Sequence, residues 1–474
     1  MSTRTTRAGA VAIAACLTLA ACAEGASQDP DDVGGGQNGN GNGAEGSAFD
    51  AGAELSGELQ IMGFGLGDDV ATSRFDIAKE ALGQDVTINH VEGALDIQQF
   101  LTSVASGNPP DIVYAAREEI GSFASRGAIM PLTECIEGEG IAIDDFKDNA
   151  MNQVTFDGTV YAIPEFNTVQ ITYANSELLD QAGLTVEDVN GSDWEALSSA
   201  NEALTQTEGG DLSVIGYDSK LPEFFPLWAR SNGVDLISED SRTSQLNDPA
   251  VVEALEYAVG IYEAQGGFGA VKALRDSADF FGEGNQFASD TLGAMPMEQW
   301  YLNVLNDVTP DVPLAFDAYR GKDGEPIAYA GGSAWAIPAD SDNPEAACRF
   351  ARSMTEVDTW IAAAENRIQL REEDGGIFTG LLTGNEVADQ EIYEMVEPTG
   401  SEVWDAGIEA MYNANDYAFN YNASPADAQF KSAWEDAVNS VLSGQQSPQD
   451  ALDKAHEEAQ AALDEAWAVW DEEG

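Results

Sequence analysis

The sequence predicts an α/β fold in which helices cover both faces of a mostly parallel sheet. Strand-like apolar runs alternate with helix-like amphipathic runs over residues 57–133. Glycines or prolines stand where most of these runs stop or begin. About 420 residues follow the N-terminal region, more than a single hydrophobic core usually holds, so we expect two compact lobes.

The first predicted elements follow one another at short intervals. Residues 59–62 alternate and break at Gly63, which predicts a strand that ends in a glycine loop. The run ATSRFDIAKEALG predicts a helix that stops at Gly83, and DVTINHVEG predicts a strand. LDIQQFLTSVASG predicts a second helix, and PPDIVYAA predicts a strand opened by prolines. Ligands bind at the carboxyl ends of the strands in such sheets, so the loops after these strands are candidate site segments.

The N-terminal sequence predicts an export signal. Arg4 and Arg7 precede an apolar run at 8–21, which is too short to cross a bilayer because a spanning helix needs ~20 apolar residues. The residues Leu19-Ala20-Ala21-Cys22 resemble the lipobox of bacterial lipoproteins, in which the cysteine is lipidated and becomes the mature N-terminus. An ordinary signal peptide cleaved near Ala21 is the alternative. We therefore expect residues 1–21 to be removed and the protein to be lipid-anchored through Cys22 on the extracellular face of the cell membrane.

Residues 22–55 predict a disordered tether. The segment is rich in glycine, asparagine and acidic residues and has few large apolar side chains, so it cannot bury enough surface to offset the entropy of ordering. A flexible chain of this length reaches ~30 Å.

The chain is strongly acidic. It has 84 acidic and 20 basic residues and a formal net charge of −64, which argues against nucleic acid and anionic lipid head groups as partners. The acids are spread along every segment, so we interpret them as a solvated surface adapted to salt; attraction of cationic ligands is the alternative.

The acidic composition leads to a prediction about salt. We expect the mature protein to melt at a higher temperature in molar salt than in dilute buffer, because salt screens repulsion between the surface carboxylates. Differential scanning calorimetry at increasing salt measures this. A flat or falling melting temperature would contradict the interpretation.

Cysteine and histidine are scarce. Cys135 and Cys348 are the thiols that remain after export and lipidation, and in an exported protein we expect them to form a disulfide. His90 and His456 lie far apart in the sequence and have no zinc-site spacing with the cysteines. Neither a GxSxG elbow nor a GxxxxGK loop is present. We therefore expect no metal, no cofactor and no catalytic residues.

Several longer strings occur in a recognisable order. They are LTSVASGNPPDIVYAAREEIGSFASRGAIMPL, FDGTVYAIPEFNTVQITYANSELLDQAGL, EFFPLWARSNGVDLI, NDPAVVEALEYAVGIYEAQG, GAMPMEQWYLN, AGGSAWAIPADSDNPEAACRFARSM and SAWEDAVNSVLSGQQSPQDAL. Together they resemble the sugar-binding group of the extracellular solute-binding proteins of ABC importers, over nearly all of residues 57–465. Two details depart from the family pattern: its Tyr-Asn pair is interrupted at Tyr173-Ala174-Asn175, and SDWEAL stands where a Thr-Trp-x-Glu-Leu turn is usual.

The resemblance implies a two-lobed, periplasmic-binding-protein-like fold of type II, whose chain crosses the hinge more than once. Lobe one would take residues 56–165 and 333–380, and lobe two would take residues 166–332 and 381–474. Cys135 and Cys348 would then share lobe one, which supports their pairing.

The resemblance also implies a ligand site between the lobes. A sugar presents flat C–H faces, which aromatic rings cover, and hydroxyls, which carboxylates and amides bind. Candidate contacts follow two strands of lobe one and the first crossing: Phe64, Asp68, Asp69, Arg117, Glu118, Glu119, Glu165, Phe166 and Asn167. Each acid has a solvated loop residue as its alternative, and Arg117 either pairs with acids across the cleft or binds ligand oxygens.

Lobe two and the later crossings supply the remaining candidates. They are Glu223, Phe224, Glu298, Trp300, Tyr301, Gly331, Gly332, Ser333, Trp335, Arg367 and Gln369. Trp300 matches the family position where a ring stacks on sugar, and Glu298 would share its strand face if the segment is extended. The glycines would let backbone groups approach a ligand. Phe224 and Trp335 have core packing as the alternative, and the proline that the family usually has near Arg367 is absent.

The closing helices lack one feature of the group. Maltose-binding members have stacking rings at the positions matched here by Lys431 and Ser432, so the resemblance argues against a maltodextrin-like mode. The expected function is capture of a sugar or oligosaccharide by a monomeric lipoprotein that delivers it to the permease subunits of an ABC transporter. A polyamine, iron or other non-sugar binding protein is one alternative. A secreted glycosidase, which would use paired carboxylates, is the other.

Overall fold

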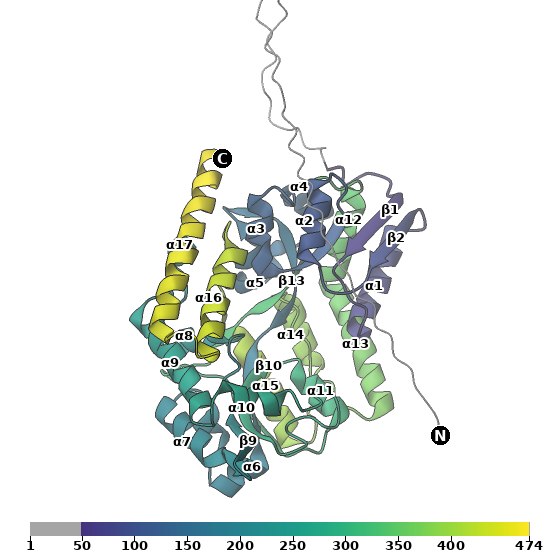
Figure 1. Ribbon diagram of the computed structural model, residues 1–474. Helices are drawn as coiled ribbons and strands as arrows, with labels where there is room; N and C mark the ends of the chain where they lie inside the picture. Colours follow the sequence, from purple (N-terminus) through teal and green to yellow (C-terminus); the bar gives the residue numbers. More distant parts are fainter. Residues whose placement is uncertain (1–48, 474) are drawn as a thin grey trace, which may run out of the picture. The chain divides into compact units, whose positions relative to one another are not determined.

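The computed structural model describes residues 49–473, and these contain two separate five-stranded sheets (Figure 1). The predicted signal peptide and Cys22 lie outside the described residues. Residues 48–474 group into one compact unit, so both sheets belong to the same body.

The first sheet carries the strands that the N-terminal pattern predicts. Its order is β2 (Val86–Val91), β1 (Gly57–Met62), β3 (Ile112–Ala116), β13 (Gly331–Ala336) and β6 (Ala162–Thr168). β1 pairs in parallel with β2 and β3, whereas β13 runs antiparallel to β3 and to β6. The carboxyl ends of β1 and β3 therefore meet at one edge, next to residues that arrive from much later in the chain.

The second sheet is mixed rather than mostly parallel. Its order is β11 (Leu314–Ala318), β7 (Gln170–Asn175), β10 (Leu292–Glu298), β9 (Asp211–Tyr217) and β8 (Gln206–Glu208). Within this sheet only β9 and β10 pair in parallel. β7 enters the sheet directly from β6 and runs between two antiparallel neighbours, β10 and β11. Two short ladders join β12 (Ala328–Tyr329) to β14 (Ala418–Phe419) and β4 (Thr155–Phe156) to β5 (Thr159–Val160).

The helices pack around these sheets. In the first half of the chain they are α1 (Asp69–Leu82), α2 (Ile97–Ala105), α3 (Ile120–Ser125), α4 (Thr133–Glu139), α5 (Asp148–Val154), α6 (Ser176–Ala182), α7 (Trp194–Leu204) and α8 (Phe225–Ser231). The later ones are α9 (Pro249–Glu263), α10 (Phe268–Arg275), α11 (Tyr301–Val308), α12 (Pro344–Thr355), α13 (Val357–Asp374), α14 (Glu386–Met395), α15 (Glu402–Asp416), α16 (Asp427–Leu442) and α17 (Pro448–Glu473). Short 3₁₀ turns cover Arg117–Glu119, Ile143–Asp145 and Val186–Val189. α1 packs on α12 and α13, while α7 packs on β9 and α15 packs on β11.

Local signals explain where α1 begins and ends. The Asp68 carboxylate accepts a hydrogen bond from the Ala71 amide at 2.7 Å, which caps the helix, and Asp69 in the first turn complements the helix dipole. Gly83 ends the helix with φ of 81°, a value that a glycine adopts without strain. Asp68 and Asp69 are thus fixed at the edge of the first sheet by the helix start.

The folded body begins before the predicted end of the tether at residue 55. The Phe49 amide donates to Glu134 of α4 at 3.0 Å, and the Phe49 and Leu55 side chains pack against the core of the first sheet. These two large apolar side chains bury enough surface to hold the segment, which a reading of its average composition overlooks.

The disulfide lies in the same core. Cys135 of α4 and Cys348 of α12 are joined, with Cα atoms 5.8 Å apart, and both residues are buried. This is the pairing expected from the sequence.

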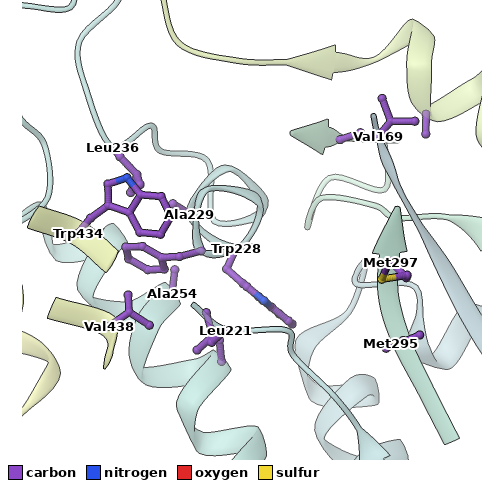
Figure 2. Close-up of a cluster of buried hydrophobic side chains, with 14 of the residues drawn as sticks. Val169, Leu221, Trp228, Ala229, Leu236, Ala254, Met295, Met297, Trp434 and Val438 are labelled. Atoms are coloured by element: carbon purple, nitrogen blue, oxygen red, sulfur yellow. The ribbon is translucent and has the colours of Figure 1, made fainter. Parts of the chain in front are cut away.

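The closing helix pair extends the largest core. Figure 2 shows Trp434 and Val438 of α16 near Leu221, Ala229 and Leu236, and Trp434 also packs on Phe225 with ring centroids 6.1 Å apart. α16 and α17 pack side by side (Figure 1), and α16 also contacts α3 and the Arg117–Glu119 turn. This helix therefore touches segments that belong to both sheets.

Candidate functional site

Two pockets lie where the chain passes between the two sheets. The first, which we call the Glu298 pocket, has a volume of about 380 Å³ and is lined by Glu118, Gln153, Thr168, Gln170, Pro222, Glu223, Phe224, Glu298, Tyr329, Gly331, Gly332, Lys431, Trp434 and Glu435. The second, the Trp300 pocket, has a volume of about 780 Å³. Its lining is Phe64, Gly65, Gly67, Asp68, Asp69, Val70, Ala71, Arg74, Tyr114, Glu165, Phe166, Phe281, Gln299, Trp300, Asn303, Val304, Asp307, Arg367, Arg371, Thr379, Gly380, Leu381, Leu382 and Met411.

Each pocket is lined by predicted site residues that come from segments next to both sheets. The Glu298 pocket holds Glu118, Glu223, Phe224, Glu298, Gly331 and Gly332. The Trp300 pocket holds Phe64, Asp68, Asp69, Glu165, Phe166, Trp300 and Arg367. The structure therefore brings thirteen of the candidate residues to these two pockets.

Glu298 and Trp300 join the pockets. β10 ends at Glu298, and Trp300 stands in a helical conformation at the start of α11, so the two residues do not share a strand face as an extended segment would require. Their side chains still meet, because the Trp300 indole N–H donates to the Glu298 carboxylate. Burial raises the pKa of Glu298, and the nearby charge of Glu223 raises it further.

Lys431 is the basic residue in the lining of the Glu298 pocket. Its ammonium contacts Glu118 and lies 3.9 Å from Glu435. Burial works to lower the pKa of Lys431, but the charge of Glu118 and its hydrogen bond outweigh burial and raise it. Lys431 is therefore already paired with carboxylates of the pocket.

Aromatic rings line the mouth of the Trp300 pocket. Phe281 is 63% exposed, and its ring lies nearly parallel to that of Trp300, with centroids 6.0 Å apart and an interplanar angle of 13°. Exposed flat rings of this kind offer a contact surface for the C–H face of a sugar at little cost in rotamer entropy.

Arg367 and Asp69 bind each other within the Trp300 pocket. The guanidinium forks onto the carboxylate with two contacts of 2.6 Å, and it also lies 3.6 Å from Asp68. Burial works to raise the pKa of Asp69, but the hydrogen bond and charge of Arg367 lower it overall. These three predicted contacts thus form an ion-paired wall between α1 and α13.

Glu165 stands at the centre of a buried network. It has no exposed surface, it forms an ion pair with Arg74 at 2.8 Å, and it accepts hydrogen bonds from the Tyr114 hydroxyl at 3.2 Å and from the Trp335 indole N–H. Arg74 in turn lies 3.8 Å from the centre of the Trp360 ring. Burial, followed by the charge of Glu165, raises the pKa of Tyr114. This network fixes the floor of the Trp300 pocket.

Arg117 and Asn167 hold the crossing segments together. Arg117 is fully buried, and its Nη2 donates to Asn167 Oδ1 at 2.7 Å and to the Gly331 carbonyl. Asn167 Nδ2 donates to Asn415 at 2.8 Å, and Asn415 donates to Asp389 at 2.9 Å. Burial lowers the pKa of Arg117 to about 10 and raises that of Asp389 to about 6. We call this chain of hydrogen bonds the crossing network.

Gly332 of β13 allows this strand to lie close to β6 and to Arg117. Its φ is +152°, and a Cβ atom there would lie 2.1 Å from the Phe166 carbonyl oxygen and 2.6 Å from Arg117 Nη2. The sequence favoured glycine here for close approach to a ligand. In the structure the close approach is to the backbone of β6 and to Arg117.

Seven candidate residues line neither pocket: Arg117, Glu119, Asn167, Tyr301, Ser333, Trp335 and Gln369. Tyr301 packs in the core, with its hydroxyl donating to the Phe280 carbonyl at 3.0 Å. Side chains alternate between the two faces of β13, and the Trp335 ring points inward into the core of the first sheet. Gln369 is exposed and bonds Glu373 one helical turn away. Burial raises the pKa of Glu119, and Glu118 adds to the effect.

The α16 residues were missed by the sequence reasoning. Lys431, Trp434 and Glu435 fall at helical spacing, so one face of α16 presents all three. The expected rings at 431 and 432 are absent, but Trp434 supplies a ring about one turn later. The helical spacing of Lys431, Trp434 and Glu435 was the signal in the sequence that could have identified them together. Arg74, Tyr114 and Phe281 were also missed, because nothing local in the sequence marks them.

Two further features, a metal-ligating cluster and a membrane-spanning helix, are absent from residues 49–473. This part of the chain has no cluster of three metal-ligating side chains. It also has no helix that combines the length and the apolar character needed to span a bilayer.

Comparisons with known proteins agree with the fold. Residues 75–369 match the family described as bacterial extracellular solute-binding protein. The maltodextrin-binding protein MdxE of Bacillus subtilis is 26% identical over 279 residues, covering 56% of this chain and 61% of that protein. A maltooligosaccharide ABC transporter solute-binding lipoprotein of Streptococcus pneumoniae is 22% identical over 397 residues, covering 80% of this chain and 81% of that protein.

Solved structures share the fold at low identity. The ABC substrate-binding protein Lmo0181 of Listeria monocytogenes, in complex with cycloalternan, has a TM-score of 0.68 and 18% identity and covers 86% of this chain and 99% of its own. The GacH receptor of Streptomyces glaucescens has a TM-score of 0.66 and 18% identity, with coverage of 86% and 99%. Their likeness extends over both sheets of the described body.

Proposed function

The chain belongs to the bacterial extracellular solute-binding proteins, and from this premise we propose that it captures a sugar or oligosaccharide and delivers it to the permease subunits of an ABC transporter. The observation that carries the proposal is the pair of pockets at the crossing segments, which combines carboxylates with flat rings. The names of the relatives, which refer to maltodextrin and maltooligosaccharide binding, support a carbohydrate ligand.

The bound sugar would remain chemically unchanged. The family is one of binding proteins, and several carboxylates of the pockets already have partners: Glu118 and Glu435 contact Lys431, and Glu165 pairs with Arg74 and accepts hydrogen bonds from Tyr114 and Trp335. We propose a monomer whose two lobes, residues 56–165 with 333–380 and residues 166–332 with 381–474, close over the ligand by a hinge motion.

The anchor is part of the same proposal. Cys22 lies outside the described residues, and its lipobox-like setting supports lipidation and an extracellular, membrane-attached protein. The S. pneumoniae relative is itself described as a lipoprotein. Metabolic labelling with a fatty acid tests this, since Cys22→Ser should abolish labelling.

A thermal-shift screen over sugars, polyols and amines tests the function. A ligand at ~100 times its dissociation constant should stabilise the protein by ~2.7 kcal/mol. An assay of reducing ends on the ligands found would show product if the protein were a glycosidase. Absence of any carbohydrate ligand, or turnover of one, would refute the proposal.

Trp300→Ala is expected to weaken binding of the sugar found in the screen by about fivefold or more, because the ring stacks on the ligand and such contacts contribute ~1 kcal/mol or more. Isothermal titration calorimetry measures the dissociation constant. Tyr417→Ala is the matched control, since Tyr417 is 50% exposed and lines neither pocket. Equal affinities of the Trp300 variant and the wild type would remove Trp300 from the site.

A further inference from the structure

The charges around the Glu298 pocket are unbalanced. Four carboxylates line it, those of Glu118, Glu223, Glu298 and Glu435, against the single ammonium of Lys431. Lys431 is already bound by Glu118 and Glu435, and Lys220, just outside the lining, lies 3.7 Å from Glu223. Within residues 49–473 Glu298 forms no ion pair, although the Trp300 indole N–H donates to it.

A second polar group in the pocket also lacks a partner. Gln153 is 4% exposed and lines the pocket, and its Oε1 has no hydrogen-bond partner among the described residues. A buried acceptor without a donor costs free energy, so the pocket gains when a ligand supplies one. The lining therefore offers two acceptors of different kinds: Gln153 Oε1, which has no donor among the described residues, and the Glu298 carboxylate, which accepts from Trp300 but has no counter-charge.

The neighbouring arginine does not supply the missing positive charge. Arg117 is absent from the lining of the Glu298 pocket and lines an adjoining cavity of about 40 Å³, which shares Glu118 and Gln153 with that pocket; its Nη2 donates to Asn167 and to the Gly331 carbonyl. The pKa of Glu298 stays raised, chiefly by burial, even though Lys220 acts in the opposite direction. A cation placed beside Glu298 would relieve this penalty.

We propose that the Glu298 pocket selects an amino sugar, with the protonated amine beside Glu298 and a hydroxyl or amine N–H donating to Gln153. The inference rests on the proposed function and specifies the class of sugar. The ammonium makes a charge-assisted hydrogen bond with a carboxylate that is otherwise unpaired, while Phe224, Tyr329 and Trp434 border the pyranose. A neutral sugar would leave Glu298 without a counter-charge.

Three matched disaccharides test the proposal. The β-1,4-linked glucosamine disaccharide, its N-acetylated form and cellobiose differ in the group at C2, which is an amine, an acetamide and a hydroxyl. By isothermal titration calorimetry, at a pH where the amine is protonated and at low salt, the amine form should bind at least about tenfold more tightly than the other two. The difference should shrink in molar salt.

Glu298→Gln keeps the shape of the side chain and should remove the preference for the amine. The control is Glu202→Gln, an exposed residue of α7 that lines neither pocket and should keep the preference. Circular dichroism checks that both variants fold, and the salt series on the wild type does not depend on any variant.

The outcomes separate this inference from the proposed function. Equal or tighter binding of cellobiose, or a preference that survives Glu298→Gln, overturns the inference alone. Binding of some other neutral sugar with no binding of the amine form does the same. If no carbohydrate binds at all, the proposed function fails and the inference fails with it.

Discussion

Replacing Glu165 by alanine should destabilise the protein by about 3–5 kcal/mol, because removal of one member of a buried ion pair leaves the other charge without a partner. Arg74 lies 2.8 Å from Glu165, and the two side chains are 4% and 0% exposed. Arg74 keeps a hydrogen bond to the Met354 carbonyl and its contact with the Trp360 ring, but neither supplies a negative charge. Tyr114 and Trp335 would lose their acceptor as well.

Urea unfolding followed by tryptophan fluorescence measures this loss. Glu223→Ala is the control, since Glu223 is 58% exposed in its pair with Lys220 and should cost less than about 1 kcal/mol. The double variant Glu165→Leu with Arg74→Met should recover much of the stability, because apolar side chains of similar volume replace both buried charges. A cost of Glu165→Ala below 1 kcal/mol would show that the network is unimportant for folding.

Loss of the disulfide should have an effect of similar size. Cys135 and Cys348 are 213 positions apart, and the chain-entropy relation gives roughly 5 kcal/mol for closing a loop of that length in the unfolded chain. Measured effects usually fall below that value, so we expect a loss of about 3–5 kcal/mol for the Cys135→Ser, Cys348→Ser double variant.

Reductant provides the internal control for this prediction. Dithiothreitol should lower the denaturation midpoint of the wild type and leave that of the double variant unchanged. If the wild type also keeps its midpoint under complete reduction, verified by thiol counting, the bond does not contribute to stability.

Helices and strands could be predicted best from the sequence where the signals that start and end them lie close together in the chain. The helix that stops at Gly83 and the strand that follows Pro110 have their determinants within a few residues. Trp300 was chosen because GAMPMEQWYLN resembles the family segment whose ring stacks on sugar, and the structure places this residue in the lining of the Trp300 pocket, just after β10.

The errors come from long-range packing. Trp335 lies near the end of β13 and Tyr301 begins α11, but which side of each element faces the core is decided by partners far away, such as Glu165, 170 positions from Trp335. Arg74 is adjacent to Glu165 although β2, β3 and several helices separate α1 from β6 in the sequence. The antiparallel pairings of β7 likewise depend on β10 and β11, which follow it by more than a hundred residues.

The side of α16 that lines the Glu298 pocket was missed for a third reason. Positions 431 and 432 carry no aromatic ring. Trp434 and Glu435 of the same helix nevertheless line the same pocket as Lys431. Matching a family's residue positions onto this chain fails when the side of the helix that faces the pocket is shifted by a few residues.

The crossing network has a consequence for how the protein can bend. Arg117 bonds residues of β6 and β13, and Asn167 and Asn415 continue the chain of bonds to Asp389 in α14, so these segments form one stiff joint. Because these bonds tie β6 and β13 to α14 and α15, we expect the four segments to move as one piece when the lobes close, and the shape that the closed protein presents to a receiving partner then depends on this joint.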